Sequence, residues 1–365
     1  MAVNILYSKW RPDSMTDEKR LENLISIFSY LLIQTNGDVN EALDWMEQLN
    51  DNYKLFDKDM TFGDFVDELK KQGYIAEKEG MKIITAKGSQ RIRTESLRKI
   101  FSGLKPDTSG FHESGKSGRG VDKLSEIKKF EFGDQVTNID LTSTIKNAFL
   151  KSDINNFRLT EADIDVYETE HMTSCATVLM IDISHSMILY GEDRITPAKE
   201  VALGLSELIL SKYPKDKLNI VVFGDDAREI TVRDLTFLTV GPFHTNTQAG
   251  LRLARQILKK KGSVNKQIIM ITDGKPSALF TDDGRIYKNS FGLDPKIVNK
   301  TLDEAVACRK DKIKITTFMI AQDQYLVNFI QEFTKANNGK AYYSDLDNLG
   351  QQIFVDYLRN RKRFD

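Results

Sequence analysis

Five oxygen-bearing side chains stand at positions where they could bind a metal ion together. Asp182 ends an apolar run and begins a DxSxS motif with Ser184 and Ser186, Asp273 follows a second apolar run, and Thr245 precedes the helical pattern between them. Carboxylate and hydroxyl oxygens suit a hard cation such as Mg²⁺ (Mn²⁺ could substitute), and the set offers no sulfur for Zn²⁺. Two carboxylates neutralise a divalent ion, which leaves a coordination position for an oxygen from outside, ideally from a partner's Asp or Glu.

A sheet must bring the ends of these separate segments to one edge. Apolar runs at 176–182, 218–223, 267–272 and 313–318 alternate with helical patterns at 198–210, 248–258, 302–309 and 326–335. Apolar strands separated by helices predict an α/β fold with a doubly wound, mainly parallel, Rossmann-like sheet covered on both faces. Ligands of such sheets bind beyond the carboxyl ends of the strands, where the five side chains are expected.

Composition divides the chain into three zones. Residues 1–104 have apolar positions at helical spacing, then a β-hairpin around Glu79-Gly80 and a basic helix at 90–101, which is the order of a winged-helix module. Residues 105–129 are rich in Gly, Ser, Lys and Asp and predict a linker or exposed loop. Residues 130–365 are predicted to form the α/β domain.

In this order and context, the five-residue set resembles the metal-ion-dependent adhesion site of von Willebrand factor A (vWA) domains. The chain is also similar to bacterial proteins in which a winged-helix-like region precedes a C-terminal vWA domain. The shared features are Lys87-Gly88, Phe132-Gly133-Asp134 and Asp356-Tyr357-Leu358.

The resemblance implies a non-enzymatic, metal-dependent adaptor that works with a MoxR-type AAA+ ATPase in remodelling or maturing client proteins. The helical N-terminal module would then dock the ATPase or the client. One departure is His244, where relatives tend to have Gly before the Thr.

Two enzyme hypotheses compete with the adaptor. Residues 110–117 match the phosphate-loop pattern GxxxxGK[ST], but no apolar strand precedes them and Gly118-Arg119-Gly120 is a poor first helical turn. His185 and His244 lie near the serines and Asp273, so a Ser-His-Asp hydrolase is conceivable, although the sequence contains no GxSxG elbow.

A third hypothesis is a nucleic-acid-binding regulator. Arg91, Arg93, Arg98 and Lys99 form a basic cluster in the winged-helix-like region, and phosphate binding uses such surfaces. Glutamates interleave with these cations, so a solvated helix face or a protein-docking module is favoured and a nucleic-acid partner is not expected.

Composition narrows the possible partners, the state of the cysteines and the expected location of the protein. The 365 residues carry a formal net charge of −1, which gives no overall field for recruiting nucleic acid or anionic lipid. Cys175 and Cys308 lie in apolar segments without CxxC spacing, which predicts buried free thiols. Residues 1–20 contain no apolar signal core and no run is long enough to span a membrane, so the expected location is the cytoplasm.

Overall fold

The computed structural model describes residues 17–102, 122–131, 139–151, 159–170, 174–191, 193–262, 265–273, 275–289, 291–320, 324–343 and 349–362. The chain divides into two compact units. The first comprises residues 1–105, 175–262 and 266–358, and the second comprises residues 106–174, 263–265 and 359–365. The phosphate-loop-like residues 110–117 and Phe132-Gly133-Asp134 lie outside the described residues.

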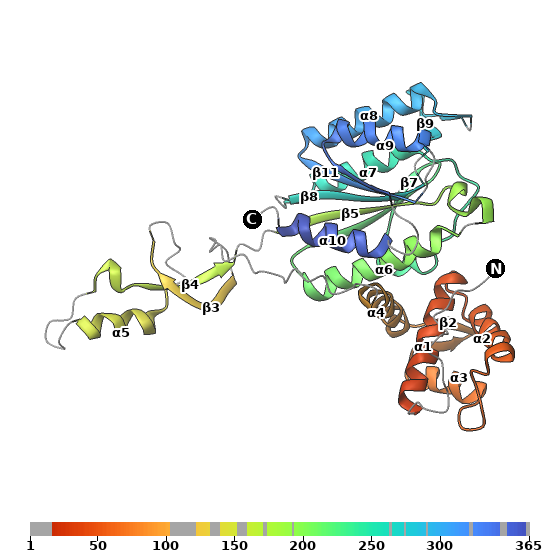
Figure 1. Cartoon of the computed structure of the whole chain (residues 1–365), viewed down its shortest axis with the longest axis horizontal. Helices are drawn as coiled ribbons and strands as arrows, with labels where there is room; N and C mark the ends of the chain where they lie inside the picture. Colours follow the sequence, from red (N-terminus) through yellow and green to blue (C-terminus); the bar gives the residue numbers. More distant parts are fainter. Residues whose placement is uncertain are drawn as a thin grey trace. The chain divides into compact units, whose positions relative to one another are not determined.

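A six-stranded sheet forms the centre of the first unit (Figure 1). Its strands, in spatial order, are β12 (Lys340–Tyr343), β11 (Ile313–Met319), β8 (Asn265–Thr272), β5 (Cys175–Asp182), β6 (Lys217–Phe223) and β7 (Ala227–Ile230). Pairing is parallel between β12 and β11, between β11 and β8, and between β5 and β6, whereas β7 is antiparallel to β6. The predicted α/β class with a mainly parallel sheet is confirmed.

Side chains alternate across the sheet and build two separate cores, because successive residues of a strand point to opposite faces. Leu179 and Ile181 of β5 pack in one core with α6 (Ile195–Lys212) and α10 (Leu349–Lys362). Val178 and Met180 pack in the other core. The helices of that face are α7 (Thr247–Lys259), α8 (Pro295–Lys310) and α9 (Gln324–Asn337).

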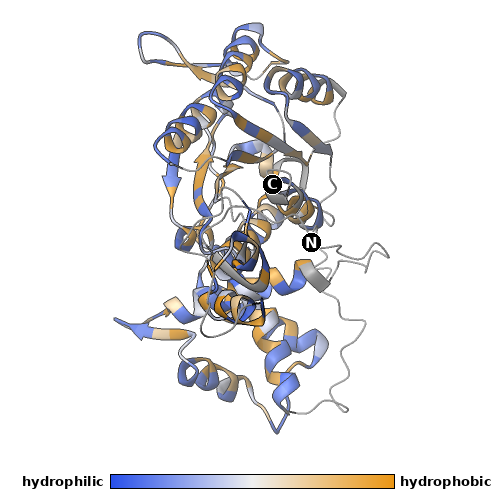
Figure 2. Cartoon of the chain, turned by 90° about the vertical axis from the view of Figure 1, so that its left-hand side faces the viewer, coloured by the Kyte–Doolittle hydropathy of each residue, from blue (hydrophilic) through white to orange (hydrophobic). Residues whose placement is uncertain are grey.

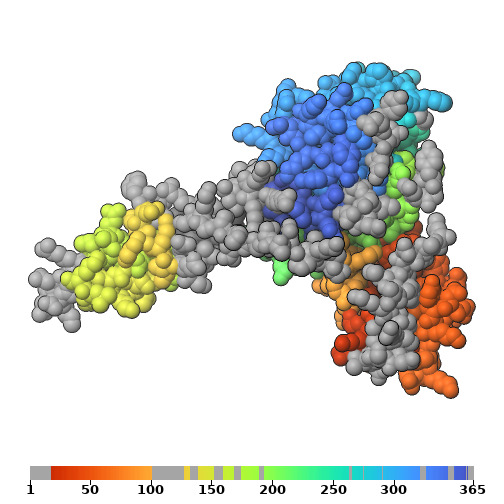
Figure 3. All heavy atoms as spheres, in the orientation of Figure 1, coloured from red at the N-terminus to blue at the C-terminus, as the bar shows by residue number. Residues whose placement is uncertain are grey.

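Figure 2 shows the apolar colouring gathered on the strands and on the helix faces turned toward them. In the space-filling view, the blue C-terminal helix α10 lies at the surface of the first unit (Figure 3). Both cysteines are buried and free, as predicted. Among the described helices, none has the length and apolarity required to cross a membrane.

The N-terminal helical region begins with three helices, α1 (Asp17–Gln34), α2 (Val39–Tyr53) and α3 (Phe62–Lys71). Asp38 caps α2 by accepting hydrogen bonds from the backbone N–H groups of Asn40 and Glu41. Thr61 and Asp64 form a reciprocal capping box at the start of α3. Local polar side chains therefore fix where these helices begin.

A β-hairpin and a fourth helix complete this region. The strands are β1 (Ile75–Lys78) and β2 (Met81–Ile84), and Glu79 and Gly80 between them both have positive φ, as a two-residue hairpin turn requires. The hairpin prediction is confirmed. The basic helix α4 (Ala86–Ser102) starts four residues before the predicted position 90. Gly88 lies in its first turn, and a Cβ at this position would lie 2.2 Å from the carbonyl oxygen of Tyr74, so the close backbone approach requires glycine.

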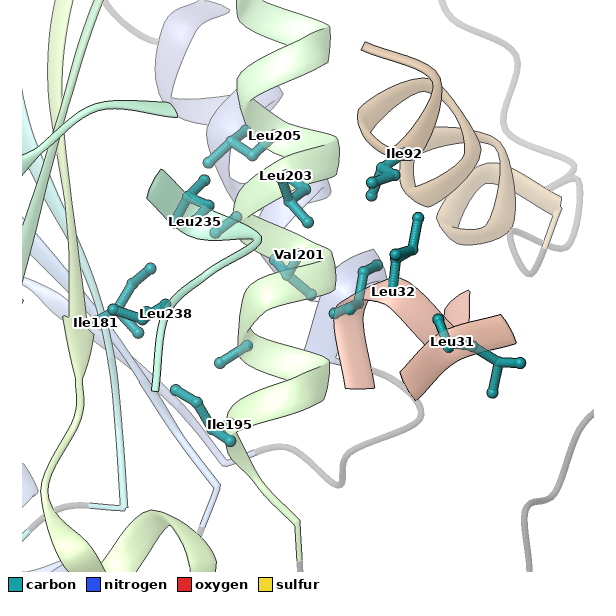
Figure 4. Close-up of a cluster of buried hydrophobic side chains, with 14 of the residues drawn as sticks. Leu31, Leu32, Ile92, Ile181, Ile195, Val201, Leu203, Leu205, Leu235 and Leu238 are labelled. Atoms are coloured by element: carbon teal, nitrogen blue, oxygen red, sulfur yellow. The ribbon is translucent and has the colours of Figure 1, made fainter. Parts of the chain in front are cut away.

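Helix α4 packs directly on α6, which joins the helical region to the sheet. Figure 4 shows Leu203 of α6 facing Ile92 of α4, while Leu205 lies on the side of Leu235. Gly204 of α6 provides the space for this contact, because a Cβ there would lie 2.9 Å from Ile100 of α4. The predicted boundary near residue 104 therefore separates two parts of one compact unit.

The second unit contains β3 (Asp122–Lys129), α5 (Leu141–Lys151), the short 3₁₀ helix η5 (Glu161–Asp163) and β4 (Asp165–Glu170), with β3 antiparallel to β4. Lys151 binds Asp163 at 2.5 Å, and this ion pair lowers the pKa of Asp163 to about 2. The last eight residues of the predicted linker 105–129 form β3, and residues 103–121 lie outside the described part of the chain.

Candidate metal-binding site

Asp182 lies at the carboxyl end of β5 and is fully buried. Its Oδ1 accepts a hydrogen bond from the backbone N–H of Ser184 (2.9 Å), and its Oδ2 accepts one from the Thr272 hydroxyl (2.7 Å). Both carboxylate oxygens are thereby held in place, one by the loop that follows β5 and the other by the end of β8. The orientation of this side chain is set before any ligand arrives.

Ser184 and Ser186 stand together on the loop and 3₁₀ helix that follow β5. Their hydroxyl oxygens are 3.0 Å apart, and Ser184 is buried while Ser186 is half-buried. Between them, the backbone N–H of His185 donates to the carbonyl oxygen of Phe243 at 3.0 Å. This bond ties the serine loop to the segment that leads into Thr245.

Thr245 is buried just before α7, whose N-cap is Asn246. Its N–H donates to the Ser277 hydroxyl (3.0 Å), and its carbonyl accepts from the N–H of Ser277 (2.9 Å). Ser277 follows Asp273 by four residues, so the bonds link the Thr245 segment to the end of β8. The sequence did not single out Ser277, because a serine in a loop is an ordinary turn residue.

Asp273 follows β8 directly and is almost fully buried. The Ser186 hydroxyl is hydrogen-bonded to its carboxylate, and Nη1 of Arg194 lies 3.5 Å from its Oδ2. Its other oxygen, Oδ1, is buried and has no hydrogen-bond partner among the described residues. A buried carboxylate oxygen without a partner is costly, and a bound cation is one way in which proteins satisfy it.

The two carboxylates destabilise each other's charged forms. Burial, and secondly the charge of Asp273, raises the pKa of Asp182 to about 7. Burial also raises the pKa of Asp273, although the Ser186 hydrogen bond and the Arg194 charge act in the opposite direction. Two adjacent buried acids with raised pKa values form a site that gains stability from a cation.

The structure thus brings Asp182, Ser184, Ser186 and Asp273 together by direct contacts, and the bond between Phe243 and His185 ties the loop that leads into Thr245 to the serine loop. The four side chains in contact offer two carboxylates and two hydroxyls, and Thr245 follows on the adjoining loop. Within the described part of the chain, no group of three or more His, Cys, Asp or Glu side chains is arranged to hold a metal ion by itself. The donor set fits a hard divalent cation and gives a softer metal such as Zn²⁺ little to bind.

The two histidines near the candidate site, His185 and His244, have different surroundings. His185 is exposed, whereas His244 faces Asp225, whose Oδ1 accepts from the His244 backbone N–H at 2.8 Å and lies 3.6 Å from the ring Nδ1. Lys288 also binds Asp225, at 2.6 Å. Ser184 contacts Ser186, and Ser186 contacts the carboxylate of Asp273, an arrangement that favours metal ligation over a Ser-His-Asp triad.

The basic cluster of α4 is engaged in ion pairs within the first unit. Arg93 binds Glu207 at 3.0 Å and Lys99 binds Glu200 at 2.8 Å, and both glutamates lie on α6. The two other arginines also have acidic partners: Arg91 pairs with Glu22, and Arg98 pairs with Glu95 at 2.7 Å. These cations neutralise local acids, which weakens the case for a phosphate-binding surface.

Comparison with known proteins identifies two segments of the chain. Residues 175–358 match the family model described as "Rv0959-like protein, vWA domain", and residues 122–169 match "Rv0959-like protein, third domain". The uncharacterized protein Rv0959 of Mycobacterium tuberculosis is 28% identical over 311 residues, which cover 83% of this chain and 46% of that protein. The chain therefore spans about half the length of the curated relatives it matches.

Solved structures with a similar fold include two pilus proteins. The PilB minor pilin from Streptococcus sanguinis is 16% identical, with a TM-score of 0.43 over 59% of this chain and 66% of that chain. The vWF domain of the type V pili tip protein Mfa5 from Porphyromonas gingivalis is 14% identical, with a TM-score of 0.41 over 51% of this chain and 97% of that chain.

Proposed function

The chain belongs to the Rv0959-like family and carries its vWA domain, and on this basis we propose that it is a non-enzymatic, metal-dependent adaptor that binds proteins. The single observation that carries the proposal is the pair of buried carboxylates, Asp182 and Asp273, of which Asp273 Oδ1 has no hydrogen-bond partner among the described residues. A divalent cation would satisfy that oxygen and relieve the repulsion between the two acids.

The residues that would hold the ion are Asp182, Ser184, Ser186, Thr245 and Asp273. Mg²⁺ is the proposed ion, with Mn²⁺ as a substitute, because all the donors are oxygens. When bound, the ion supplies a Lewis-acidic position that a carboxylate from another protein can fill. The chain's own part is to orient Asp182 through Ser184 and Thr272, so that little ordering remains to be done on binding.

The proposed partner is a MoxR-type AAA+ ATPase, with client remodelling or maturation as the joint activity and the cytoplasm as the location. This part of the proposal rests on the resemblance in the sequence. The docking of α4 on α6 supports a refinement of it: the ion pairs of Arg93 and Lys99 are used within the chain, so a partner of the helical region would bind another of its surfaces.

A direct test is binding of a purified MoxR-type ATPase to the immobilised full-length chain, in Mg²⁺ and in EDTA. We expect capture in Mg²⁺, loss in EDTA, and loss in Asp182→Ala under both conditions. Asp67→Asn, an exposed acid on α3, is the matched control and should behave as the unmodified protein. Capture by Asp182→Ala at full strength would contradict metal-dependent binding.

A further inference from the structure

Basic side chains gather where β8 and β11 begin, at the end of the strands opposite the candidate metal site. Helices α7 and α8 end there. Residues 256–266 and 305–314 contain eight basic residues and one acid, Asp311. Lys314 has a further interaction of its own and is set apart. The other seven, all in the first unit, form what we call the basic surface: Lys259, Lys260, Lys261, Lys266, Arg309, Lys310 and Lys312.

Direct contacts hold the ends of α7 and α8 side by side. Asp311, the C-cap of α8, has its Oδ2 3.0 Å from Nη1 of Arg255 and 3.5 Å from Nζ of Lys259, both on α7. Strand β8 adds Lys266, which is in register with Ile313, the residue after Lys312. Three segments that are distant in the sequence therefore bring their cations to one place.

Most of these charges are not neutralised by the chain. Lys260, Arg309, Lys310 and Lys312 are exposed, and the side chains at 261 and 266 are half-buried. Within the described residues, Lys259 alone among the seven has an ion pair, with Asp311. Asp311 is itself shared with Arg255. One divided carboxylate cannot balance seven cations.

The nearest other acids are already engaged. Glu304 on α8 binds Arg255 at 2.7 Å. Glu332 on α9 is exposed, and Lys335 three residues later carries the opposite charge. Asp216, just before β6, is buried and accepts hydrogen bonds from a tyrosine hydroxyl and a backbone N–H. The basic surface therefore keeps a positive charge.

The helix dipole explains part of this arrangement. Cations are favoured in the last turn of a helix, and the last turns of α7 and α8 carry them. Lys266, however, lies in a strand, and Lys261 and Lys312 follow the helices. The whole chain has a net charge of −1, so the excess is local. Like charges gathered in this way repel one another and favour the binding of an anion.

The chemistry of the surface distinguishes among anionic partners. In these two segments, no large apolar side chain that the structure describes is exposed. A basic patch without an inserted apolar group or a lipid anchor gives only weak membrane binding. Exposed ion pairs with protein carboxylates contribute little individually. A nucleic acid duplex carries a negative charge about every 1.7 Å of its axis, and the counterions that it releases favour binding.

We propose that the basic surface binds the phosphate backbone of double-stranded nucleic acid without reading its sequence. Six of its seven cations are lysines, which are point charges on flexible stems and can follow phosphates at varying positions. This activity is additional to the proposed function and does not depend on it, because the basic surface and the candidate metal site lie at opposite ends of the strands.

The test measures binding of a fluorescein-labelled DNA duplex of about 20 base pairs to the full chain by fluorescence anisotropy, at salt concentrations between about 50 and 200 mM. EDTA is present throughout, so that the candidate metal site does not contribute. We expect binding that weakens steeply as salt increases. A second duplex of unrelated sequence should bind equally well, because phosphates carry no sequence information.

Two triple variants with the same change of charge locate the binding surface. The first replaces exposed cations of the basic surface, Lys260→Gln, Lys310→Gln and Lys312→Gln. It should bind DNA about tenfold more weakly, and the slope of log affinity against log salt should become shallower by about 2 to 3. The control replaces exposed lysines elsewhere, Lys58→Gln, Lys78→Gln and Lys300→Gln, and should match the unmodified protein.

Circular dichroism would verify that both variants are folded. Absence of duplex binding at the lowest salt concentration would overturn the proposal, and so would equal DNA affinities of the two triple variants. Tighter binding to phosphatidylserine vesicles or to poly-glutamate than to the duplex would assign the basic surface to a lipid or a protein partner instead. Each of these results would leave the candidate metal site unaffected.

Discussion

The ammonium group of Lys199 lies 2.9 Å from the side-chain oxygen of Asn36. The same group donates to the carbonyl oxygen of Ile33 at 2.8 Å, in the last turn of α1. Lys199 is fully buried on α6, five residues after Arg194. The first turns of α6 therefore contact both the candidate metal site, through Arg194, and the end of α1, through Lys199. A cation at a helix C-terminus satisfies carbonyl groups that have no partner within the helix.

Replacement of Lys199 should therefore lower the stability of the protein, because it removes a contact between α6 and the N-terminal helical region. Lys199→Met preserves much of the apolar stem but leaves the Ile33 carbonyl without its buried donor, and we expect a loss of about 1–3 kcal/mol in the free energy of unfolding. Urea denaturation measures this loss. Lys212→Met, at the exposed end of α6, is the control and should change stability by less than about 0.5 kcal/mol. Equal effects of the two substitutions would show that the buried contact is not important.

Lys199 should also give stability a specific dependence on pH. Burial lowers its pKa from 10.5 to about 8, so between these values the unfolded chain binds more protons than the folded chain. The Lys199 contribution to stability therefore rises as the pH increases from about 8 to 10.5. Subtraction of the Lys199→Met curve from that of the unmodified protein should isolate this rise. Parallel curves would mean that Lys199 titrates normally.

Asp182 should have the opposite effect on the metal-free protein. Its pKa is raised to about 7, so its contribution is fully present below the ordinary value near 3.8 and is lost as the pH rises through about 7. Asp182→Asn removes the charge, and in EDTA at pH 8 we expect it to be more stable than the unmodified protein by about 1–2 kcal/mol. The difference should shrink toward pH 4. A variant less stable at pH 8 would argue that the carboxylate is stabilised there without a cation.

The contact between α4 and α6 should be sensitive to a single methyl group. In Gly204→Ala the new Cβ would lie 2.9 Å from Ile100 Cδ1 and 3.3 Å from the backbone of Leu97. We expect a net loss of about 1–2 kcal/mol, although alanine favours the helix. Gly63→Ala is the matched control, because a Cβ there meets only Thr61 Oγ1 at 3.7 Å. Unchanged or increased stability in Gly204→Ala would show that the helices separate without penalty.

The sheet, and the position of the proposed site residues at the ends of its strands, could be predicted because their signals are local. β5, β6, β8 and β11 are nearly continuous apolar runs, and residues that end such strands meet at one edge whatever the details of packing. By contrast, the short hairpin of β9 (Ala278–Phe280) and β10 (Ile286–Lys288) was not predicted. Three residues carry too little periodicity to distinguish a strand from a loop.

The roles of Arg194 and Lys199 could not be predicted, because they depend on which helix packs against which. A lysine within an apolar helix is normally on the solvated face, and here it is buried only because α1 ends against α6. For the same reason, the sequence could not show whether the basic cluster of α4 binds nucleic acid or pairs with acidic side chains of the chain itself. Its glutamate partners Glu200 and Glu207 lie more than a hundred residues away along the chain.

The most direct test of a metal-dependent adhesion site is isothermal titration of the EDTA-treated, dialysed protein with Mg²⁺ and Mn²⁺ in acetate buffer. We expect one binding site per chain in the unmodified protein and in Asp67→Asn, and none in Asp182→Ala. Circular dichroism of each variant would verify that it is folded. Absence of binding to the unmodified protein, or undiminished binding to a folded Asp182→Ala, would contradict the metal site on which the proposed function depends.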